Sequence, residues 1–408
     1  MGIFDQLSDD MIWNDFLFYK LSKGNLEKHE ERDLMKFVTN REYLQIVNKI
    51  IAKEPFPIPI IKEINKNGVN KKRSVFSFRR EYNYVLKYLA YLLQSYDYLF
   101  EKNLYSFRNN TGVRKALFRV TRYTDISRVY TYKVDIHDYF NSINTEILIQ
   151  KMNSTMPAEK DLIDFLASIL RNPYAIKDGQ IIETKKGAMA GVPFSGFLAN
   201  LYLCELDQWF ANRRILYVRY SDDIIVFSNS IEQINEYKTI IRQFFDCLHL
   251  QINDKKEFQT YPGDNIEFLG LTLSPDSVDV SPMSEKKLKG KLKRKARALY
   301  RWRIKKQLDG DKAAKAFIKF TNRKFYSDML QGEITWCRWY FPVITTDKTL
   351  KRIDDYSISC IRYLYSGKYG KQNFNVRYES IVNLGYRSLV NNYWKFRRGE
   401  YSKENINI

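Results

Sequence analysis

Cysteine and histidine are scarce in this chain of 408 residues, which contains four of the first and three of the second. The cysteines are scattered and only one of them has a histidine near it, Cys247 with His249, so the sequence offers neither a zinc-binding spacing nor a disulfide framework. Glycine (17 residues) and proline (10 residues) are too few for a collagen-like or low-complexity chain. No apolar run approaches the roughly 20 residues that span a bilayer, and the amino terminus lacks the pattern of a signal peptide. We therefore expect a cytoplasmic protein without a membrane partner.

Excess positive charge is nearly absent from the first two thirds of the chain and concentrated in the last third. The net charge is +20, from 67 Lys and Arg against 47 Asp and Glu. Residues 281–408 hold 30 basic and 11 acidic side chains, whereas residues 1–280 hold 37 and 36. A localised basic field of this size is typical of proteins that bind phosphate backbones. A basic surface that serves only solubility is the alternative.

Helical and extended patterns follow one another irregularly along the chain. Residues 1–50 place apolar side chains at helical spacing without proline, and residues 281–408 are again largely helical in pattern. Between them, β-rich and helical runs are interspersed, and Asn67-Gly68 predicts a hairpin turn. Because these runs do not form regular βαβ units, we expect an α+β fold. The length favours a helical amino-terminal extension (1–50), a central mixed region (51–280) and a basic helical region (281–408).

Two β-rich segments carry Asp residues that burial alone does not explain. Asp135 lies in the strand-like run 131–136, and Asp222-Asp223 separate two further β-rich runs. Adjacent carboxylates repel each other, so a cluster in such apolar surroundings requires a cation. Two divalent ions about 4 Å apart would bind three carboxylates and stabilise the attacking and leaving oxygens of a phosphoryl transfer. The alternative is that Asp222 and Asp223 are only favourable turn residues of a hairpin.

A series of motifs surrounds these carboxylates, in the order found in reverse transcriptases. The motifs are 72–75, 106–108, 135–143, 190–202, 220–223, the spaced set Leu250, Asn253 and Lys256, and 268–270. The chain therefore resembles reverse transcriptases. It looks like the bacterial defence-associated enzymes (the unknown-group and abortive-infection types), which are related to retron and group II intron reverse transcriptases. The motif at 190–202 is shortened, because Phe194 follows Pro193 and Gly196 follows Ser195.

The resemblance implies a right-hand polymerase with fingers, a palm built on an antiparallel sheet, and a helical thumb. Residues 51–280 would form the fingers and palm, and the basic region the thumb. The resemblance also implies that Asp135, Asp222 and Asp223 are catalytic and bind two Mg²⁺ ions, with the Ile136 carbonyl as a further ligand. Oxygen ligands of this kind suit a hard cation.

Other motif positions imply contacts to the substrates. The nucleotide-binding residues expected from the resemblance are Lys72, Arg73, Ile136, Phe140, Gly191, Pro193 and Lys256. Those expected to bind nucleic acid are Phe268, Leu269 and Gly270 of the primer grip and Lys289, Lys293, Arg297 and Arg301 of the thumb. Phe140 would exclude ribonucleotides because its ring collides with a 2′-OH, with core packing as the alternative. Lys72 and Arg73 would hold the triphosphate, or else form a solvated charged run.

The most basic segment has a helical pattern. Twelve of the 21 residues from 286 to 306 are Lys or Arg, and none is acidic. The apolar residues that recur at helical spacing in this segment are Leu288, Leu292, Ala296 and Leu299. They predict a helix that is anchored by a narrow apolar stripe and basic elsewhere. A thumb helix of this kind would contact phosphates and sugars of the template–primer duplex.

We therefore expect an RNA-directed DNA polymerase that makes cDNA from a structured non-coding RNA partner and dNTPs, in antiphage defence. A second copy of the chain or a second defence subunit is a further expected partner. The sequence leaves open a retron-type enzyme, template-independent or protein-primed synthesis, and a non-catalytic RNA-binding scaffold. Its 30 tyrosines offer many hydroxyls for protein priming, so no single one is favoured.

Overall fold

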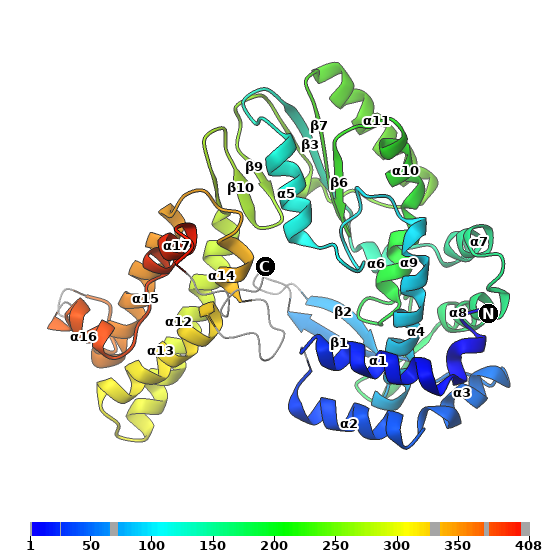
Figure 1. Cartoon of the computed structure of the whole chain (residues 1–408), viewed down its shortest axis with the longest axis horizontal. Coiled ribbons are helices and arrows are strands. Elements are labelled where there is room, and N and C mark those ends of the chain that lie inside the picture. Colours follow the sequence, from blue (N-terminus) through cyan, green and yellow to red (C-terminus); the bar gives the residue numbers. More distant parts are fainter. Residues whose placement is uncertain (1, 25, 66–71, 327–334, 371–374, 401–408) are drawn as a thin grey trace. The chain divides into compact units, whose positions relative to one another are not determined.

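The computed structural model describes residues 2–24, 26–65, 72–326, 335–370 and 375–400. Contacts divide the chain into two compact units, residues 1–263 and 264–408 (Figure 1). The second unit thus includes residues 264–280, which the sequence assigns to the fingers and palm, and the three-part division stays a prediction. The predicted turn at Asn67-Gly68 lies outside the described residues.

The first unit begins with helices, as predicted. These are η1 (Asp5–Ser8), α1 (Asp10–Ser22), α2 (Lys28–Thr39) and α3 (Tyr43–Ile51). Asp9 caps α1, because its side chain accepts two backbone hydrogen bonds from the first turn. Trp13 of α1 is fully buried, and its ring stacks on those of Tyr43 and Tyr88 with centroid distances of 4.2 and 3.9 Å. Since Tyr88 belongs to α4 (Arg80–Leu92), this stack ties the amino-terminal helices to the rest of the unit.

A four-stranded sheet follows, in the order β2-β1-β4-β5. Its strands are β1 (Ile60–Asn65), β2 (Lys72–Ser77), β4 (Tyr174–Lys177) and β5 (Gln180–Glu183). β1 and β2 are antiparallel with Ile60 opposite Ser77, which confirms the predicted hairpin pairing. The helices and 3₁₀ segments of the rest of this unit are η2 (Leu93–Leu99), α5 (Val113–Tyr123), α6 (Tyr139–Ser142), α7 (Thr145–Thr155), α8 (Lys160–Arg171), α9 (Ser195–Tyr202), α10 (Cys204–Asn212), α11 (Ile231–Cys247) and η3 (Asp254–Lys256).

The second sheet of this unit has the order β6-β7-β3-β8, with every neighbour antiparallel. Its strands are β3 (Tyr130–Asp135), β6 (Tyr217–Tyr220), β7 (Asp223–Ser228) and β8 (Phe258–Thr260). Helix α11 packs against β3 and β7, while α5 and α10 pack against β6 (Figure 1). The central run Ile224, Ile225 and Val226 is wholly buried. A strand buried on both faces reads as a continuous apolar run, as this segment does in the sequence.

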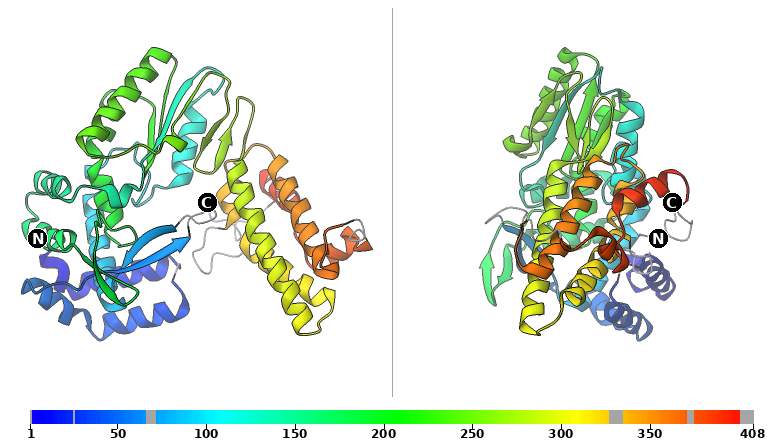
Figure 2. Two further views of the ribbon diagram at one scale, coloured as in Figure 1. Left: turned by 180° about the vertical axis from the view of Figure 1, so that it is seen from behind. Right: turned by 90° about the vertical axis from the view of Figure 1, so that its left-hand side faces the viewer.

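The second unit combines a small sheet with the basic helices. The sheet has the order β11-β10-β9, from β9 (Ile266–Phe268), β10 (Leu271–Leu273) and β11 (Val278–Val280). The helices are α12 (Pro282–Lys305), α13 (Gly310–Tyr326), α14 (Trp336–Tyr340), α15 (Lys348–Ser366), α16 (Tyr378–Asn383) and α17 (Leu389–Arg397). Helices α12, α13 and α15 pack against one another, as the two views of Figure 2 show.

The start and the buried face of α12 follow directly from its sequence. Ser281 caps the helix by accepting a hydrogen bond from the Ser284 N–H, and Pro282 occupies its first turn, where no backbone donor is needed. The residues of its predicted apolar stripe are all buried: Leu288, Leu292, Ala296 and Leu299. The predicted basic helix is therefore confirmed.

Irregularly interspersed helices and mainly antiparallel sheets confirm the predicted α+β class. Among the described helices, none combines the length and the apolar character that crossing a membrane requires.

Candidate active site

A tight turn brings three carboxylates to one end of the β3–β7 pair. Asp135, the last residue of β3, lies opposite Asp223, the first residue of β7. Tyr220 of β6 also pairs with Asp223, so Ser221 and Asp222 form a two-residue turn. The three residues predicted to be catalytic therefore meet at one end of the sheet, although Asp222 and Asp223 follow Asp135 by 87 and 88 positions.

The Asp135 carboxylate is buried, with 2% of the residue exposed, and both of its oxygens are hydrogen-bonded. Oδ1 accepts a bond of 2.9 Å from Asn253 Nδ2, and Oδ2 accepts a bond of 2.5 Å from Lys256 Nζ. The Asn253 N–H also donates to the Asp135 carbonyl, and the Ile136 N–H donates to the Asp222 carbonyl. These bonds place Lys256, a predicted nucleotide-binding residue, beside a predicted catalytic residue.

Negative charge outweighs positive charge at this end of the sheet. Burial raises the pKa of Asp222 to about 6, and the neighbouring carboxylates of Asp135 and Asp223 add to the rise. Burial opposes the charge on Lys256, but its hydrogen bond and its attraction to Asp135 outweigh burial and leave the Lys256 pKa raised. Lys133 Nζ lies 4.0 Å from Asp223 Oδ1. Two ammonium groups thus face three carboxylates, an imbalance that a bound cation relieves.

The donor chemistry of this cluster fits a hard divalent cation, but the ligands are not assembled around one. Within the described ranges, no three His, Cys, Asp or Glu side chains are grouped as a metal site. Both oxygens of Asp135 are engaged by Asn253 and Lys256. A cation that takes Asp135 as a ligand therefore competes with the Lys256 ammonium. The raised pKa of Asp222 and the oxygen-only donors suit such a cation.

Lys72 and Arg73 of β2 have different surroundings, since neighbouring residues of a strand face opposite sides. Lys72 Nζ lies 2.7 Å from a Glu63 carboxylate oxygen, and Lys177 Nζ lies 2.7 Å from the other. Hydrogen bonds from Lys177 and then Lys72 lower the pKa of Glu63 to about 2. The Arg73 guanidinium instead lies over the Phe140 ring, with its Cζ 5.8 Å from the ring centroid. The structure thus brings Arg73, rather than Lys72, to the predicted sugar-sensing residue.

Phe140 lies in a tightly packed pocket of backbone and aromatic rings. It is 8% exposed, and its ring meets that of Phe107 edge-on at a centroid distance of 5.8 Å. A Cβ at Gly187 would approach the Phe140 carbonyl oxygen to 2.2 Å, and a Cβ at Gly196 would approach the Phe107 ring to 2.6 Å. Phe140 is therefore closely packed and also lies beside Arg73. Its position suits both the predicted exclusion of ribonucleotides and the alternative of core packing.

The loop that carries Gly191 and Pro193 is attached to β2. The Ala190 carbonyl accepts a hydrogen bond of 2.7 Å from the Phe76 N–H. Gly191 has a φ of +100°, and a Cβ there would lie 2.9 Å from the Phe76 carbonyl oxygen, so the loop requires glycine. Pro193 is half-buried two residues further on. Both predicted nucleotide-binding positions thus lie on a loop fixed to the strand of Arg73.

The three predicted primer-grip residues belong to the second unit. Phe268 is 1% exposed, so its side chain is a core residue of the small sheet. Leu269 and Gly270 have φ angles of +47° and +88° and form the two-residue turn between β9 and β10. Leu269 and Gly270 are partly exposed, whereas the Phe268 ring is not.

The predicted thumb cations of α12 fall into two groups. Lys293, Arg297 and Arg301 are exposed. Lys289 is partly buried and donates a hydrogen bond of 2.6 Å to Glu285, to which Arg352 of α15 also donates. Lys289 is therefore engaged within the unit, and the other three face solvent there.

The sequence analysis missed the polar residues that support the carboxylate turn. Arg219 of β6 and Asp207 of α10 form a fully buried ion pair, and Ser106 bonds to the backbone of the turn. Arg219 stands in a β-rich run in which charged residues normally face solvent. A signal was nevertheless present, because an arginine two residues before a turn of buried carboxylates requires a buried partner.

Residues 64–273, which are more than half of the chain, match the family described as reverse transcriptase (RNA-dependent DNA polymerase). The fold and the carboxylate site are those of a nucleic-acid polymerase palm, and the chain belongs to the reverse transcriptase family. This result confirms the resemblance drawn from the motifs and, with it, the right-hand polymerase class.

The chain is also similar to two curated proteins. It is 25% identical over 198 residues to a COX1/OXI3 intron 2 protein of Saccharomyces cerevisiae, covering 48% of this chain and 23% of that protein. It is 25% identical over 161 residues to the retron Ec83 reverse transcriptase of Escherichia coli, covering 36% of this chain and 49% of that protein. The chain thus spans less than half the length of either relative.

Solved telomerase structures are also similar to the chain. Telomerase from Candida tropicalis truncated from its C-terminal domain matches with 14% identity and a TM-score of 0.44, covering 55% of each chain. Telomerase from Candida albicans in complex with a fragment of telomeric RNA matches with 13% identity and a TM-score of 0.43, covering 90% of this chain and 71% of that one.

Replacing Asp222 by Asn is expected to stabilise the metal-free protein at alkaline pH. A carboxyl whose pKa is about 6 in the folded chain, against an ordinary 3.8, takes up a proton on folding. Its ionised form therefore weakens the fold as pH rises from about 4 to 6. We expect Asp222→Asn to raise the free energy of unfolding by about 1–2 kcal/mol at pH 8 in EDTA and hardly at all at pH 4.

Denaturant titration at both pH values measures this difference. Asp178→Asn is the matched control, because Asp178 occupies the exposed turn of the β4–β5 hairpin in the same unit. An equal gain for Asp222→Asn at pH 4 and pH 8 would show that ionisation of the buried carboxyl is not its cause.

Proposed function

We propose that the chain is an RNA-directed DNA polymerase that copies an RNA template into cDNA from dNTPs. The observation that carries the proposal is the pairing of Asp135 with Asp223, with Asp222 in the adjoining turn, in a member of the reverse transcriptase family. Three carboxylates at one end of a buried sheet suit nucleotidyl transfer because they can hold the cations that neutralise the negative charge developing on oxygen.

In this proposal Asp135, Asp222, Asp223 and the Ile136 carbonyl hold two Mg²⁺ ions. When bound, these ions neutralise charge on the attacking and leaving oxygens. Lys256 supplies positive charge beside Asp135 and holds its carboxylate in place through a hydrogen bond. Arg73, held over Phe140, provides a forked donor for the triphosphate of the incoming nucleotide.

The template in this proposal is a structured non-coding RNA, and the basic helices of the second unit are its binding surface. The excess charge of residues 281–408 supports this assignment. Resemblance to defence-associated enzymes supports a role in antiphage defence in the cytoplasm, with a second copy or another defence subunit as a further partner. Similarity to a retron reverse transcriptase keeps a retron-type enzyme as the main alternative. Template-independent and protein-primed synthesis are further outcomes that sequencing of the cDNA product distinguishes.

Replacing both Asp222 and Asp223 by Asn is expected to reduce dNTP incorporation on an RNA template with a DNA primer to background, because the cation ligands are lost. Primer extension in Mg²⁺ measures incorporation, and the rise in melting temperature on adding Mg²⁺ to the free protein measures binding. Asp178→Asn, in the β4–β5 turn, is the control and should retain both. A double variant that still extends the primer would refute the catalytic assignment, whereas an inactive wild type that binds RNA would favour the scaffold.

Replacing Phe140 by Ala is expected to admit ribonucleotides, because the ring that would collide with the 2′-OH is gone. The ratio of kcat/KM for a ribonucleotide to that for the matching dNTP should rise by about 10- to 100-fold. Phe140→Tyr keeps the ring and should leave the ratio near the wild-type value. An unchanged ratio in the alanine variant, with dNTP kinetics intact, would assign Phe140 to core packing.

Replacing the exposed cations of α12 by Gln is expected to weaken RNA binding and flatten its salt dependence. The four substitutions are at Lys293, Arg297, Arg301 and Lys305. If the protein neutralises about six phosphates, log K falls with log[salt] at a slope of about −4 to −5, and losing four contacts brings the slope to about −1 to −2.

Filter binding of RNA between 50 and 300 mM salt measures the slope. The matched control replaces four exposed lysines of the amino-terminal helical region, namely Lys28, Lys36, Lys49 and Lys53. Equal slopes for the two quadruple variants would mean that the α12 charge is a solvated face.

A further inference from the structure

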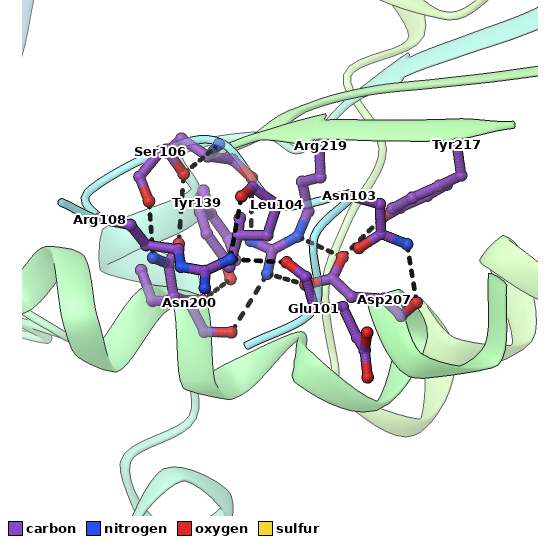
Figure 3. Close-up of polar contacts among 12 residues, drawn as sticks. Glu101, Asn103, Leu104, Ser106, Arg108, Tyr139, Asn200, Asp207, Tyr217 and Arg219 are labelled. Carbon is purple, nitrogen blue, oxygen red and sulfur yellow. Dashed lines mark hydrogen bonds and ion pairs between the residues drawn. The ribbon is translucent and has the colours of Figure 1, made fainter. Parts of the chain in front are cut away.

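A buried arginine lies directly behind the carboxylate turn. Arg219 of β6 is 0% exposed and is bound in a forked ion pair to Asp207 of α10 (Figure 3). Its Nε lies 2.8 Å from Asp207 Oδ1, and its Nη2 lies 2.5 Å from Oδ2. The Tyr217 hydroxyl donates to the same Oδ1 at 3.0 Å. Removing two charges from water is unfavourable, so a pair of this kind serves geometry more than stability.

The remaining donors of Arg219 reach the turn and the neighbouring helix. Nη1 donates to the Ser221 carbonyl oxygen at 3.4 Å, and Nη2 donates to the Asn200 carbonyl oxygen of α9 at 3.2 Å. The guanidinium therefore links the backbone just before Asp222 to two helices.

Ser106 binds the backbone N–H of the same residue, Ser221. Its Oγ accepts a hydrogen bond of 2.8 Å from the Ser221 N–H and donates one of 3.2 Å to Asn200 Oδ1. Asn200 Nδ2 returns a bond of 2.8 Å to the Ser106 carbonyl. Both Ser106 and Asn200 are 0% exposed. Ser221 has a φ of +61°, which an L-residue other than glycine adopts at a cost, so its conformation depends on such external bonds.

The segment that carries Ser106 is itself fixed to the edge of the sheet. Leu104 pairs with Arg219 as a parallel bridge, through the bonds Tyr105 N–H to Arg219 C=O and Arg219 N–H to Asn103 C=O, both 3.0 Å. The Arg108 guanidinium donates to the carbonyls of Asp97, Glu101 and Leu104, with bonds of 2.6 to 3.3 Å (Figure 3). The Ser106 hydroxyl is therefore presented to the turn from a rigid position.

We infer that Ser106 and the Arg219–Asp207 pair are positioning residues for the catalytic carboxylates. They hold the N–H and the C=O of Ser221, and through that residue they set the direction in which Asp222 and Asp223 face Asp135. They act only through the turn backbone and contact neither nucleotide nor cation. The inference rests on the proposed polymerase function. It adds which residues hold the catalytic carboxylates in position. Positioning matters because a displacement of reacting groups by about 1 Å lowers the rate about a hundredfold.

Ser106→Ala is the sharpest test, because it removes one oxygen atom and leaves the Arg219–Asp207 pair intact. We expect kcat for single-nucleotide addition to fall about 10- to 100-fold. The KM for dNTP and the Kd for the template–primer should change less than threefold, and the Mg²⁺ concentration for half-maximal rate should rise. Hydrogen exchange of the full chain should show faster exchange in the peptide that contains Ser221, without any nucleotide present.

Ser357→Ala is the matched control. Ser357 is equally buried, and its hydroxyl donates to a helix carbonyl in the second unit. This variant should change neither kcat nor exchange at Ser221. If the wild type is inactive, the polymerase proposal fails, and exchange at Ser221 together with Mn²⁺ affinity still tests the positioning role. If the wild type is active and Ser106→Ala retains its kcat, or loses kcat only as far as Ser357→Ala does, the positioning role is overturned.

Discussion

The pairing of β3 with β7 is the constraint on which the site depends, because it sets two carboxylates directly opposite each other. Like charges opposite one another destabilise a sheet, and a register shift of one residue would relieve the repulsion here. Such a shift would also move the buried side chains of these strands away from the neighbours against which they pack. Since Val134 and Ile224 next to the two Asp residues are wholly buried, close packing holds the register against the charges.

Groups that are distant in the sequence offset part of the repulsion between these carboxylates. Lys256 and Asn253 bind Asp135, Lys133 approaches Asp223, and the pKa of Asp222 stays raised because the residue is buried beside the carboxylates of Asp135 and Asp223. The charged cluster therefore lowers the stability of the fold, as expected at a site where function requires unfavourable charge. A cation that took Asp135 as a ligand would displace the Lys256 ammonium, so the group that stabilises Asp135 also competes with a cation for it.

Some of this arrangement can be predicted from the sequence, namely the parts that depend on residues close together in the chain. The turn at Ser221-Asp222 and the buried stripe of α12 follow from patterns within a few residues. The opposite faces of Lys72 and Arg73 follow from strand alternation, although their motif suggested a joint role. Contacts between residues far apart do not follow from such patterns: Lys256 binds Asp135 across 121 positions and Ser106 binds Ser221 across 115. Phe268 lies in the predicted primer-grip motif, but the packing of the small sheet around it buries its side chain.

The charge of the second unit also shows that the sequence does not reveal which residues pair with one another. The sequence assigns α12 a continuous basic surface, but its cations are not equivalent, because their partners differ. Glu285 binds both Lys289 of α12 and Arg352 of α15, so these charges join two helices of the unit. Arg303, another α12 cation, donates to the carbonyls of Leu364 and Tyr365 at the end of α15, where a positive charge is favoured by the helix dipole. Part of the excess positive charge therefore joins helices α12 and α15. The α12 cations that face away from α15 are the ones left for the RNA binding that we propose. The net charge of a segment predicts that a polyanion binds, whereas the pairing of each cation decides where.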